Sequence, residues 1–347
     1  MAGLFLIWPW LGYIICMVKV AIATTLRDAG VTLDSFVAYH LHIGFAHLFL
    51  FFDDPADPGL ERFAQHPNVT AIAHDSHLRQ LWAGLPEYRA GSEFADREVM
   101  ARQVFNAALA MDWARQKQCG WLLHIDADEL FFLPQQSLAE HFAEMDTAAA
   151  DTVRYANFEG VPEKTGITDP FREVDLFKVP PELWDVTEEC RALLENTPQI
   201  PAKRFHFYRN GKSAVRLSAA QLRPSGVHKF ANPNGESRGA RARGAFILHY
   251  ACCGFDAFWQ KYVTLGPFAD RWLDTYDIRE TIGPLHLDAR DVVAAGDQDA
   301  ARAFYRERFA MEDAERVRQL IQHGILTRIP EPGKLLERIA PSAELAT

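Results

Sequence analysis

Cysteines are few in this sequence and their pattern is irregular. The chain contains five of them, at positions 16, 119, 190, 252 and 253. An odd number without regular spacing excludes a disulfide framework and a zinc-finger pattern. The adjacent pair Cys252 and Cys253 is not expected to form a bridge, because such a bridge would be strained. The cysteines therefore give no indication of the cellular compartment.

An excess of basic residues is also missing. The chain has 36 Lys and Arg against 46 Asp and Glu, which gives a net charge of −10. Proteins that bind nucleic acid generally present a basic face. The composition therefore argues against a nucleic-acid partner, although it is compatible with a local basic pocket for a phosphate group.

No apolar run reaches the roughly 20 residues that a membrane-spanning helix needs. Residues 3–18 come nearest, but Pro9 and Gly12 interrupt them and no basic residue precedes them. We interpret residues 1–18 as an anchor or a signal remnant, with a buried first segment as the alternative. An anchor would make the protein membrane-associated or place it in the secretory pathway; otherwise we expect it in the cytoplasm.

The remaining sequence has the profile of a globular α/β protein. Its 347 residues are 48 % hydrophobic and 24 % charged, which is ordinary for one or two folded domains. Strand-like apolar runs alternate with helical patterns in the first third of the chain. This order predicts a mostly parallel central sheet flanked by helices. The expected strands are 19–25, 47–52, 69–73 and 121–125, the expected helices 33–44, 59–65 and 93–117, and residues 74–92 are expected to be an irregular loop.

The pattern becomes less regular after residue 133. Residues 180–205 are rich in Pro and Glu and are expected to form a loop or lid. From about residue 285 the chain is polar and helical. We therefore predict a main domain over 19–270 and a helical C-terminal extension over 271–347. Further strands are expected at 153–158, 174–179, 213–217 and 245–250.

The strongest chemical signal follows the fourth expected strand. The run Trp121 to Ile125 ends in Asp126, Asp128 and Glu129. A carboxylate at the end of a buried strand is costly to desolvate unless it is paired or bound to a cation. In extended backbone, residues two apart project to the same side. Two carboxylates on one side suit Mg²⁺ or Mn²⁺ carrying a substrate phosphate, whereas a loop with helix-capping acids is the alternative.

Sequence context distinguishes this motif from a second copy. The chain also contains Asp297-Gln298-Asp299, in a polar stretch that we interpret as a solvated helix start. Only the first copy follows a strand-like run. Ligands of parallel sheets bind at the carboxyl ends of strands, and three polar clusters are expected at such ends: Thr24/Thr25, Asp53/Asp54 and Asp126/Asp128.

Several segments together resemble the glycosyltransferases of families 2 and 92, which have the GT-A fold. The resemblance runs from about residue 19 to 265. It implies transfer of a sugar from a nucleotide diphosphate donor to a hydroxyl acceptor, with Mn²⁺ on the diphosphate. The segments that carry it are Phe36-Val37-Ala38-Tyr39-His40 with Gly44, Asp53-Asp54 with Asp57, Trp121 to Leu130, Gly211-Lys212 with Arg216, Ser225 to Phe230, and Leu248-His249-Tyr250 with Phe258 and Lys261.

The sequence also departs from this family. Members often have Lys-Asn-Glu after the first strand, where this chain has Thr25-Leu26-Arg27-Asp28. The second strand usually ends in Asp-Asn, where this chain has Asp53-Asp54. The altered first loop concerns recognition of the base, so a UDP-sugar is favoured over a GDP-sugar. The resemblance suggests galactose, and the acceptor would be a glycan, a protein or a lipid.

Roles follow from residue chemistry together with the resemblance. Asp128 and Asp126 are the expected metal ligands, with Asp126 alternatively on the ribose, and a late histidine, His249 or His228, would complete the site. Acids and hydroxyls at the strand ends would hold the nucleoside, and cationic side chains the diphosphate. An inverting enzyme also needs a general base. The nucleotide-binding candidates are Thr24, Thr25, Arg27, Asp53, Asp54, Lys212 and Arg216, and the candidate bases are Glu159, Asp175 and Asp256.

Two other functions remain as alternatives. A Mg²⁺-dependent nucleotidyltransferase would use paired carboxylates on the same type of sheet. It would be expected to carry a Gly-rich loop after the first strand, and Thr24 to Arg27 is not one. A non-catalytic sugar-nucleotide-binding protein is the second alternative, and the intact Asp126/Asp128 pair argues against it.

Overall fold

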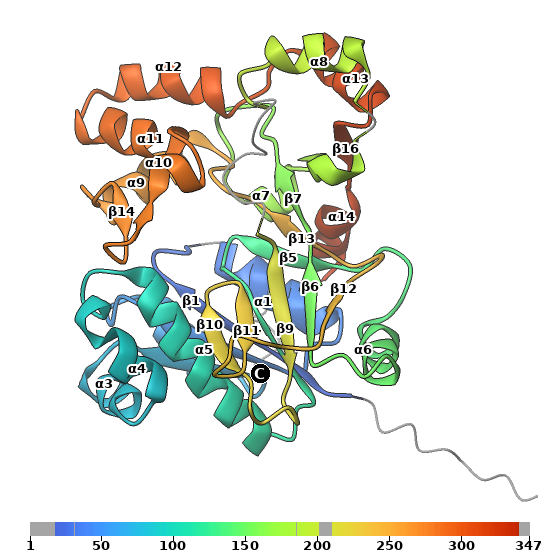
Figure 1. The fold of residues 1–347 in the computed structure, drawn as a ribbon. Helices are drawn as coiled ribbons and strands as arrows, with labels where there is room; N and C mark the ends of the chain where they lie inside the picture. Colours follow the sequence, from blue (N-terminus) through green and yellow to red (C-terminus); the bar gives the residue numbers. More distant parts are fainter. Residues whose placement is uncertain (1–17, 31, 185, 201–209, 340–347) are drawn as a thin grey trace, which may run out of the picture.

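The computed structural model describes residues 18–30, 32–184, 186–200 and 210–339. Two β-sheets form the framework and helices cover them (Figure 1). The predicted mixed α/β fold, with a large and mostly parallel sheet flanked by helices, is confirmed. Most of the predicted anchor, residues 3–17, lies outside the described residues. Within the described part of the chain, no helix is both long enough and apolar enough to cross a membrane.

The larger sheet contains seven strands in the order β12-β6-β9-β4-β1-β2-β3. Its β3-β2-β1-β4 portion is parallel throughout, whereas β9 runs antiparallel to both of its neighbours. Every residue of β1 and β2 is buried, as expected for apolar strands covered on both faces. The strands are β1 (Val20–Leu26), β2 (His47–Phe52), β3 (Val69–Ala73), β4 (Trp121–His124), β6 (Thr152–Tyr155), β9 (Lys212–Arg216) and β12 (Gly239–Arg241).

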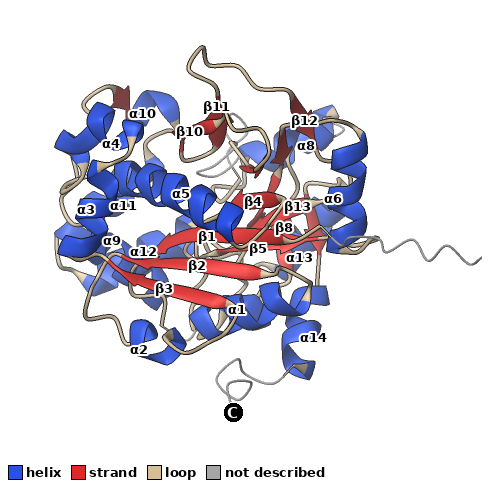
Figure 2. Ribbon diagram, turned by 90° about the horizontal axis from the view of Figure 1, so that it is seen from below, coloured by secondary structure: helices blue, strands red, loops and turns tan. Residues whose placement is uncertain are grey.

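Helices pack on both faces of this sheet, which gives three layers (Figure 2). Alternate residues of β1 enter different cores: Ile22 joins the cluster that contains Phe36 of α1, and Ala23 joins the cluster that contains Phe105 of α5. This alternation follows from the two-residue repeat of a strand. The helices of this part are α1 (Thr32–His42), α2 (Gly59–Phe63), α3 (Ser76–Ala83), α4 (Pro86–Gly91), the 3-10 turn η1 (Ser92–Phe94), α5 (Val99–Gln116) and α6 (Leu138–Thr147).

The prediction of an irregular loop over residues 74–92 was wrong, because α3 and α4 occupy most of it. Asp75 caps α3 by accepting a hydrogen bond from the backbone N–H of Leu78. Leu78 and Trp82, four residues apart, supply the buried face. Pro86 stands at the start of α4, where its missing N–H is not needed. Two buried residues are too few to produce a recognisable helical period.

The second sheet has five strands in the order β16-β8-β7-β13-β5. Strand β5 follows β4 after a four-residue connection, so residues 125–128 join the two sheets. Within this sheet β7 and β13 are parallel, and the other pairs are antiparallel. The strands are β5 (Glu129–Phe132), β7 (Asn157–Gly160), β8 (Leu176–Lys178), β13 (Phe246–His249) and β16 (Leu326–Arg328).

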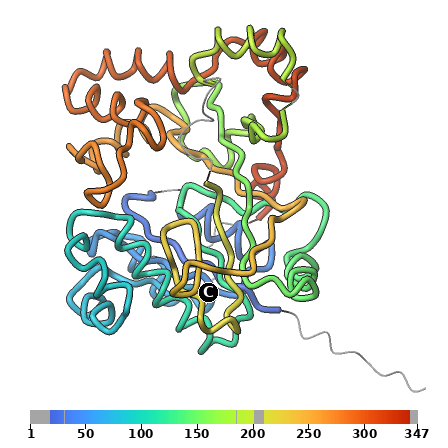
Figure 3. Tube along the Cα trace, in the orientation of Figure 1, coloured from blue at the N-terminus to red at the C-terminus, as the bar shows by residue number. Residues whose placement is uncertain are grey.

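The chain after residue 270 is largely helical, but it also returns to the second sheet. Strand β16 pairs with β8, so the red end of the trace lies beside a green segment in Figure 3.

Asp297 caps α12, which confirms that the second Asp-x-Asp copy is a helix start. Besides the strands of the two large sheets, the elements after β8 are the 3-10 turn η2 (Pro181–Leu183), α8 (Glu188–Glu195), the hairpin β10 (Arg223–Gly226) and β11 (Lys229–Ala231), α9 (Phe255–Leu265), the hairpin β14 (Arg271–Trp272) and β15 (Tyr276–Asp277), α10 (Ile278–Thr281), α11 (Leu285–Ala294), α12 (Gln298–Arg308), α13 (Ala314–Gln322) and α14 (Glu331–Arg338).

Residues 180–205 are not simply a loop, because α8 lies within them. Thr187 caps this helix through the N–H of Cys190. Cys190 and Leu194 then form its buried side. Near β7 and β8, the short helix α7 (Pro170–Glu173) packs against α14 and α1.

Candidate active site at the junction of the two sheets

The connection between β4 and β5 is a tight turn that holds the predicted metal-binding acids. The N–H of Glu129 donates to the carbonyl of Asp126. The Glu129 carboxylate in turn accepts the N–H of Asp126 at 2.8 Å. The backbone therefore forms a turn here, and the expectation of an extended backbone with both aspartates on one side was wrong. As a result, Asp126 and Asp128 contact different partners.

Asp126 is bound by two side chains from distant parts of the chain. Lys212 Nζ lies 2.5 Å from one of its carboxylate oxygens, and Gln103 Nε2 donates to the other at 2.6 Å. Burial opposes ionisation of Asp126, but the Lys212 ammonium outweighs it and holds the pKa of Asp126 below its usual value. Both carboxylate oxygens are therefore already engaged.

Lys212 is a buried cation at the start of β9, and its side chain is 2 % exposed. Besides Asp126, it approaches Glu129 at 3.5 Å. Gly211 allows the chain to reach this position: its φ is +60°, and a Cβ there would lie 2.0 Å from the carbonyl oxygen of Tyr155. Lys212 was predicted to contact phosphate, but its ammonium is committed to these acids.

Glu129 supports the turn from inside the protein and is 3 % exposed. Burial raises its pKa to about 7, although Lys212 opposes the shift. This side chain therefore closes the turn and does not face the solvent.

Asp128 is the more accessible of the two aspartates, with 37 % of its side chain exposed. One carboxylate oxygen lies 3.6 Å from His249 Nε2 and 3.5 Å from Lys261 Nζ. Burial opposes ionisation, but Lys261 and His249 outweigh it and keep the pKa of Asp128 well below its usual value. The carbonyl of Asp128 also accepts the N–H of Tyr250, which ties the turn to the end of β13.

His249 is held by a carboxylate on its other side. Glu159 is directly opposite it on β7, and both Glu159 oxygens lie 2.9 Å from His249 Nδ1. Nδ1 therefore donates to Glu159, and Nε2 is directed at Asp128. Burial disfavours the charged ring, but Glu159 and Asp128 outweigh it and raise the pKa of His249 well above its usual value. Asn157 also donates to Glu159.

Lys178 lies behind this group, opposite Glu159 on β8. It is 1 % exposed. Burial lowers its pKa to about 7, and Glu159 opposes the shift. Glu159 was a candidate general base, but it is 1 % exposed and bound to His249, so its position suits the orientation of the histidine.

Asp128 and His249 would supply two ligands to a divalent cation once the cation displaces the proton on Nε2 of His249, because a histidine binds metal in its neutral form. A carboxylate oxygen and a ring nitrogen face each other, and Glu159 fixes the ring as second partners of metal-binding histidines commonly do. In the described ranges, no group of three or more His, Cys, Asp or Glu side chains is arranged to hold a metal ion, so the protein alone would supply only these two ligands. Mg²⁺ is usually held by one or two carboxylates plus substrate phosphates and water. The donor set therefore suits a cation that binds together with a diphosphate.

The carboxyl ends of β1 and β2 form a second polar group next to this site. Asp53 is 7 % exposed and makes a two-pronged ion pair with Arg102 of α5, at 2.8 and 2.5 Å. Asn106, one turn further along α5, donates to the hydroxyl of Thr25 at 2.9 Å. The hydroxyl of Thr24 is buried and has no hydrogen-bond partner within the described residues. These residues line the sheet edge where parallel α/β proteins bind ligands.

Other predicted residues lie in different settings. The structure places Arg216 against the carbonyls of Met145 and Ala150. Asp175, just before β8, pairs with Arg328 at 2.5 Å. Neither residue is brought to Asp128.

Four further predicted residues have local contacts or are exposed. His228 Nδ1 donates to the carbonyl of Gly211. Arg27 is half exposed and lies 3.9 Å from Asp28. Asp54 caps the turn that follows β2 by accepting the N–H of Ala56. Asp256 is exposed in the first turn of α9.

Sequence reasoning did not identify four side chains that shape this site. Arg102, Gln103 and Asn106 are buried polar residues on α5, and each binds an acid or hydroxyl at a strand end. These three polar residues fall within five positions of a helix whose other buried residues are mostly apolar. That cluster was the sequence feature that could have indicated them. Lys261 lay within the recognised pattern, but its position near Asp128 follows only from the fold.

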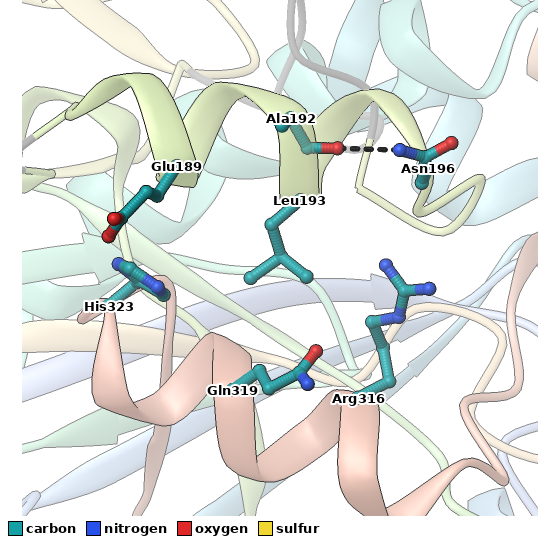
Figure 4. Close-up of a pocket in the computed structure, with 7 residues that line it drawn as sticks. All are labelled: Glu189, Ala192, Leu193, Asn196, Arg316, Gln319 and His323. Carbon is teal, nitrogen blue, oxygen red and sulfur yellow. Dashed lines mark hydrogen bonds between the residues drawn. The ribbon is translucent and has the colours of Figure 1, made fainter.

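A separate hollow of about 720 Å³ lies between α8 and α13 (Figure 4). Leu193 points from α8 into the space between the two helices, and Glu189 and His323 lie at one end (Figure 4). Neither helix carries any of the residues predicted for the active site. This hollow is therefore distinct from the junction of the sheets.

Comparison with known proteins gives distant relatives. No family model matches the chain. Among solved structures, TarS of S. aureus aligns with a TM-score of 0.32 and 9 % identity, over 71 % of this chain and 39 % of that one. Core-mannan synthase A from Aspergillus fumigatus, in an Mn/GDP form, aligns with a TM-score of 0.29 and 11 % identity, over 58 % of this chain and 60 % of that one.

Two curated proteins of Arabidopsis thaliana resemble the sequence over most of its length. "Glycosyltransferase-like At2g41451" is 27 % identical over 323 residues, which cover 87 % of this chain and 68 % of that protein. "Glycosyltransferase-like At3g57200" is 25 % identical over 322 residues, which cover 87 % of this chain and 60 % of that protein. The resemblance to glycosyltransferases predicted from the motifs is thus confirmed, and the chain is a distant homologue of glycosyltransferase-like proteins.

Proposed function

We propose that this protein is a glycosyltransferase that uses a nucleotide diphosphate sugar and a divalent cation, Mn²⁺ or Mg²⁺. The observation that carries the proposal is the arrangement of Asp128 and His249, with His249 fixed by Glu159 at the end of a strand. Asp128 and His249 would hold the cation. When bound, the cation neutralises charge on the departing nucleoside diphosphate.

The donor is proposed to lie along the carboxyl ends of β1, β2 and β4. Asp53, fixed by Arg102, and the buried hydroxyls of β1 are placed where dinucleotide folds hold ribose and base. The family resemblance favours a UDP-sugar over a GDP-sugar and suggests galactose. Because Lys212 and Gln103 occupy Asp126, this acid is proposed to organise the site rather than to bind the metal directly.

The acceptor is proposed to be a hydroxyl group of a glycan, protein or lipid. Direct attack by a deprotonated hydroxyl would invert the sugar configuration, and it requires a general base. Glu159 is engaged with His249 and Asp175 with Arg328. Asp256, which is exposed on the helix that carries Lys261, is therefore the proposed base.

A donor panel tests this proposal. Each UDP- and GDP-sugar is incubated with the protein and Mn²⁺, and slow donor hydrolysis is measured without any acceptor. We expect one donor to be hydrolysed by the wild type, and Asp128→Asn to abolish both hydrolysis and Mn²⁺-dependent UDP binding without unfolding the protein. Asp299→Asn is the matched control, because Asp299 is the last residue of the second Asp-x-Asp, which starts α12.

The same measurements identify the alternatives. Unchanged turnover by Asp128→Asn would refute the assignment of this site. Nucleotide binding without hydrolysis or transfer across the whole panel would indicate a non-catalytic binding protein. Release of pyrophosphate from a nucleoside triphosphate and a sugar phosphate would indicate a nucleotidyltransferase.

A further inference from the structure

Helix α9 crosses the edge of the candidate donor site. It begins at Phe255, six residues after His249, and carries two side chains that reach toward the first sheet. Lys261 approaches Asp128 at 3.5 Å, and the hydroxyl of Thr264 donates to Asp28 at 3.2 Å. Residues three apart lie on the same side of a helix. The Lys261/Thr264 side of α9 therefore faces the sheet edge.

The other side of α9 anchors the helix. Phe255, Phe258 and Tyr262 are buried in a separate core with α11 and α12. The chain after α9 is also fastened to the first part of the molecule: the N–H of Leu273 donates to Glu98, and Arg97 pairs with Asp274 at 2.6 Å. Lys261 is thus carried by a helix that is packed along one side and is followed by a segment tied to the first part of the molecule.

The two lysines of the site differ in their surroundings. Lys212 is 2 % exposed and is held between two acids. Lys261 is 28 % exposed and lies near one oxygen of Asp128, the same oxygen that faces His249 Nε2. An ammonium group and a divalent cation repel each other when both approach one carboxylate. A cation bound by Asp128 and His249 would therefore displace Lys261 toward another anion.

A nucleoside diphosphate supplies such an anion at this place. Its phosphates would share the cation with Asp128, and so they would lie within the region that α9 covers. Arg27, which is half exposed beside Asp28, stands at the same rim because Asp28 is the residue that contacts Thr264. Lys261 is thus the cation that lies beside Asp128 in the described structure, and Arg27 is next in sequence to the residue that α9 contacts.

We propose that Lys261 is a donor-binding residue whose ammonium exchanges Asp128 for the diphosphate when cation and nucleotide bind. This inference rests on the proposed function, because it takes the donor to be a nucleoside diphosphate sugar. In the protein without nucleotide, Lys261 neutralises Asp128. In the complex it would neutralise a phosphate oxygen.

The exchange predicts effects of opposite sign on two ligands. Lys261→Met should strengthen binding of Mn²⁺ alone, because the competing ammonium is gone. The same variant should weaken binding of UDP in the presence of Mn²⁺ by about 10- to 100-fold, the usual effect of losing one charge-assisted hydrogen bond. The affinity for UMP, which lacks the second phosphate, should fall less than the affinity for UDP. Lys261→Arg should recover most of the UDP affinity.

Isothermal titration of the whole chain with Mn²⁺, UDP, GDP and UMP measures these effects. Lys117→Met is the control, since Lys117 is exposed at the end of α5, next to the start of β4 and so at the opposite edge of the sheet. Lys261→Gln is a second variant that keeps a polar side chain. Joint weakening of Mn²⁺ and UDP, or no change in UDP binding, would overturn the inference. A wild type that binds neither UDP nor GDP would instead overturn the proposed function, and this inference with it.

Discussion

Glu159 fixes the direction in which His249 presents its second ring nitrogen. Both Glu159 oxygens lie 2.9 Å from Nδ1, so Nε2 faces Asp128. The two residues are on paired strands, β7 and β13, and are directly opposite each other. The position of the histidine is therefore set by the pairing of the strands as well as by its own side chain.

The first prediction concerns this pair. Glu159→Gln should weaken Mn²⁺ binding by about 10- to 100-fold, because outer partners of metal-binding histidines set their orientation and basicity. Titration of the purified protein with Mn²⁺ measures the effect. Glu163→Gln is the control, since Glu163 pairs with Arg328 away from this histidine. Equal affinities for the two variants would argue against a metal at Nε2.

The second prediction separates the roles of the two aspartates. Asp126→Asn leaves the buried Lys212 with only the more distant Glu129, and should lower the free energy of unfolding by about 2–4 kcal/mol. Asp128→Asn should change it by less than about 1 kcal/mol, because Asp128 is 37 % exposed and exposed ion pairs contribute little. Urea denaturation measures both. Similar stability losses would contradict the division of roles.

The third prediction concerns Arg102, which is 11 % exposed and pairs with Asp53. Arg102→Met should destabilise the protein by about 3 kcal/mol, because it leaves a buried carboxylate without its cation. Arg102→Lys should recover only part of this loss, since an ammonium cannot make the two-pronged contact. In the double variant with Asp53→Asn the loss should be smaller than in Arg102→Met alone. Thermal and urea unfolding measure these stability losses. If the loss in the double variant equalled the sum of the losses in the two single variants, the prediction would be refuted.

The fourth prediction is a pH dependence that arises from His40. Its Nδ1 donates to the carbonyl of Phe36 at 2.8 Å, and its Nε2 accepts the N–H of Phe131 at 3.1 Å, so the neutral ring satisfies both contacts. Burial lowers its pKa from 6.5 to about 3, although the Phe36 contact opposes the shift. The unfolded chain therefore binds more protons than the folded chain between these values. This stabilising contribution is complete above pH 6.5 and is lost as the pH falls toward 3.

Urea denaturation at pH 7.5, 6 and 5 tests the contribution of His40. His40→Leu should be about 2 kcal/mol less stable at pH 7.5, because the N–H of Phe131 loses its acceptor. It should also show a shallower decline toward pH 5 than the wild type. His77→Leu, at an exposed position of α3, should change neither value. If the free energy of unfolding of His40→Leu fell as steeply with pH as that of the wild type, groups other than His40 would dominate the pH dependence.

The sequence predicted the parallel half of the large sheet because each apolar run there contacts its neighbours in chain order. It also singled out Asp128 and His249 as candidate site residues, and the structure brings their side chains within 3.6 Å of each other; their role in metal binding stays a prediction. The partners of these residues depend on the order of strands distant in sequence. Lys212 reaches Asp126 because β9 lies beside β4, which no local pattern indicates.

The resemblance motif Tyr39-His40 with Gly44 gives a related lesson. It was recognised as a family pattern, and the structure gives His40 a role in packing: it links α1 to β5. Tyr39 makes a similar link, because its hydroxyl donates to the carbonyl of Phe131 at 3.1 Å. Residues of a resemblance motif can therefore serve to hold a neighbouring strand, here β5, in place.

The order of strands in the second sheet has a consequence for biosynthesis. Asp128 lies next to β5, Glu159 is on β7 and His249 on β13, and β16 near residue 326 completes the same sheet. A ribosome-bound chain that has emerged only as far as residue 200 contains the aspartate and the glutamate but lacks the strand between β5 and β7. Because domains form from the N-terminus during translation, we expect the large sheet's parallel strands to assemble early and the proposed cation site to be completed only after β13 has emerged.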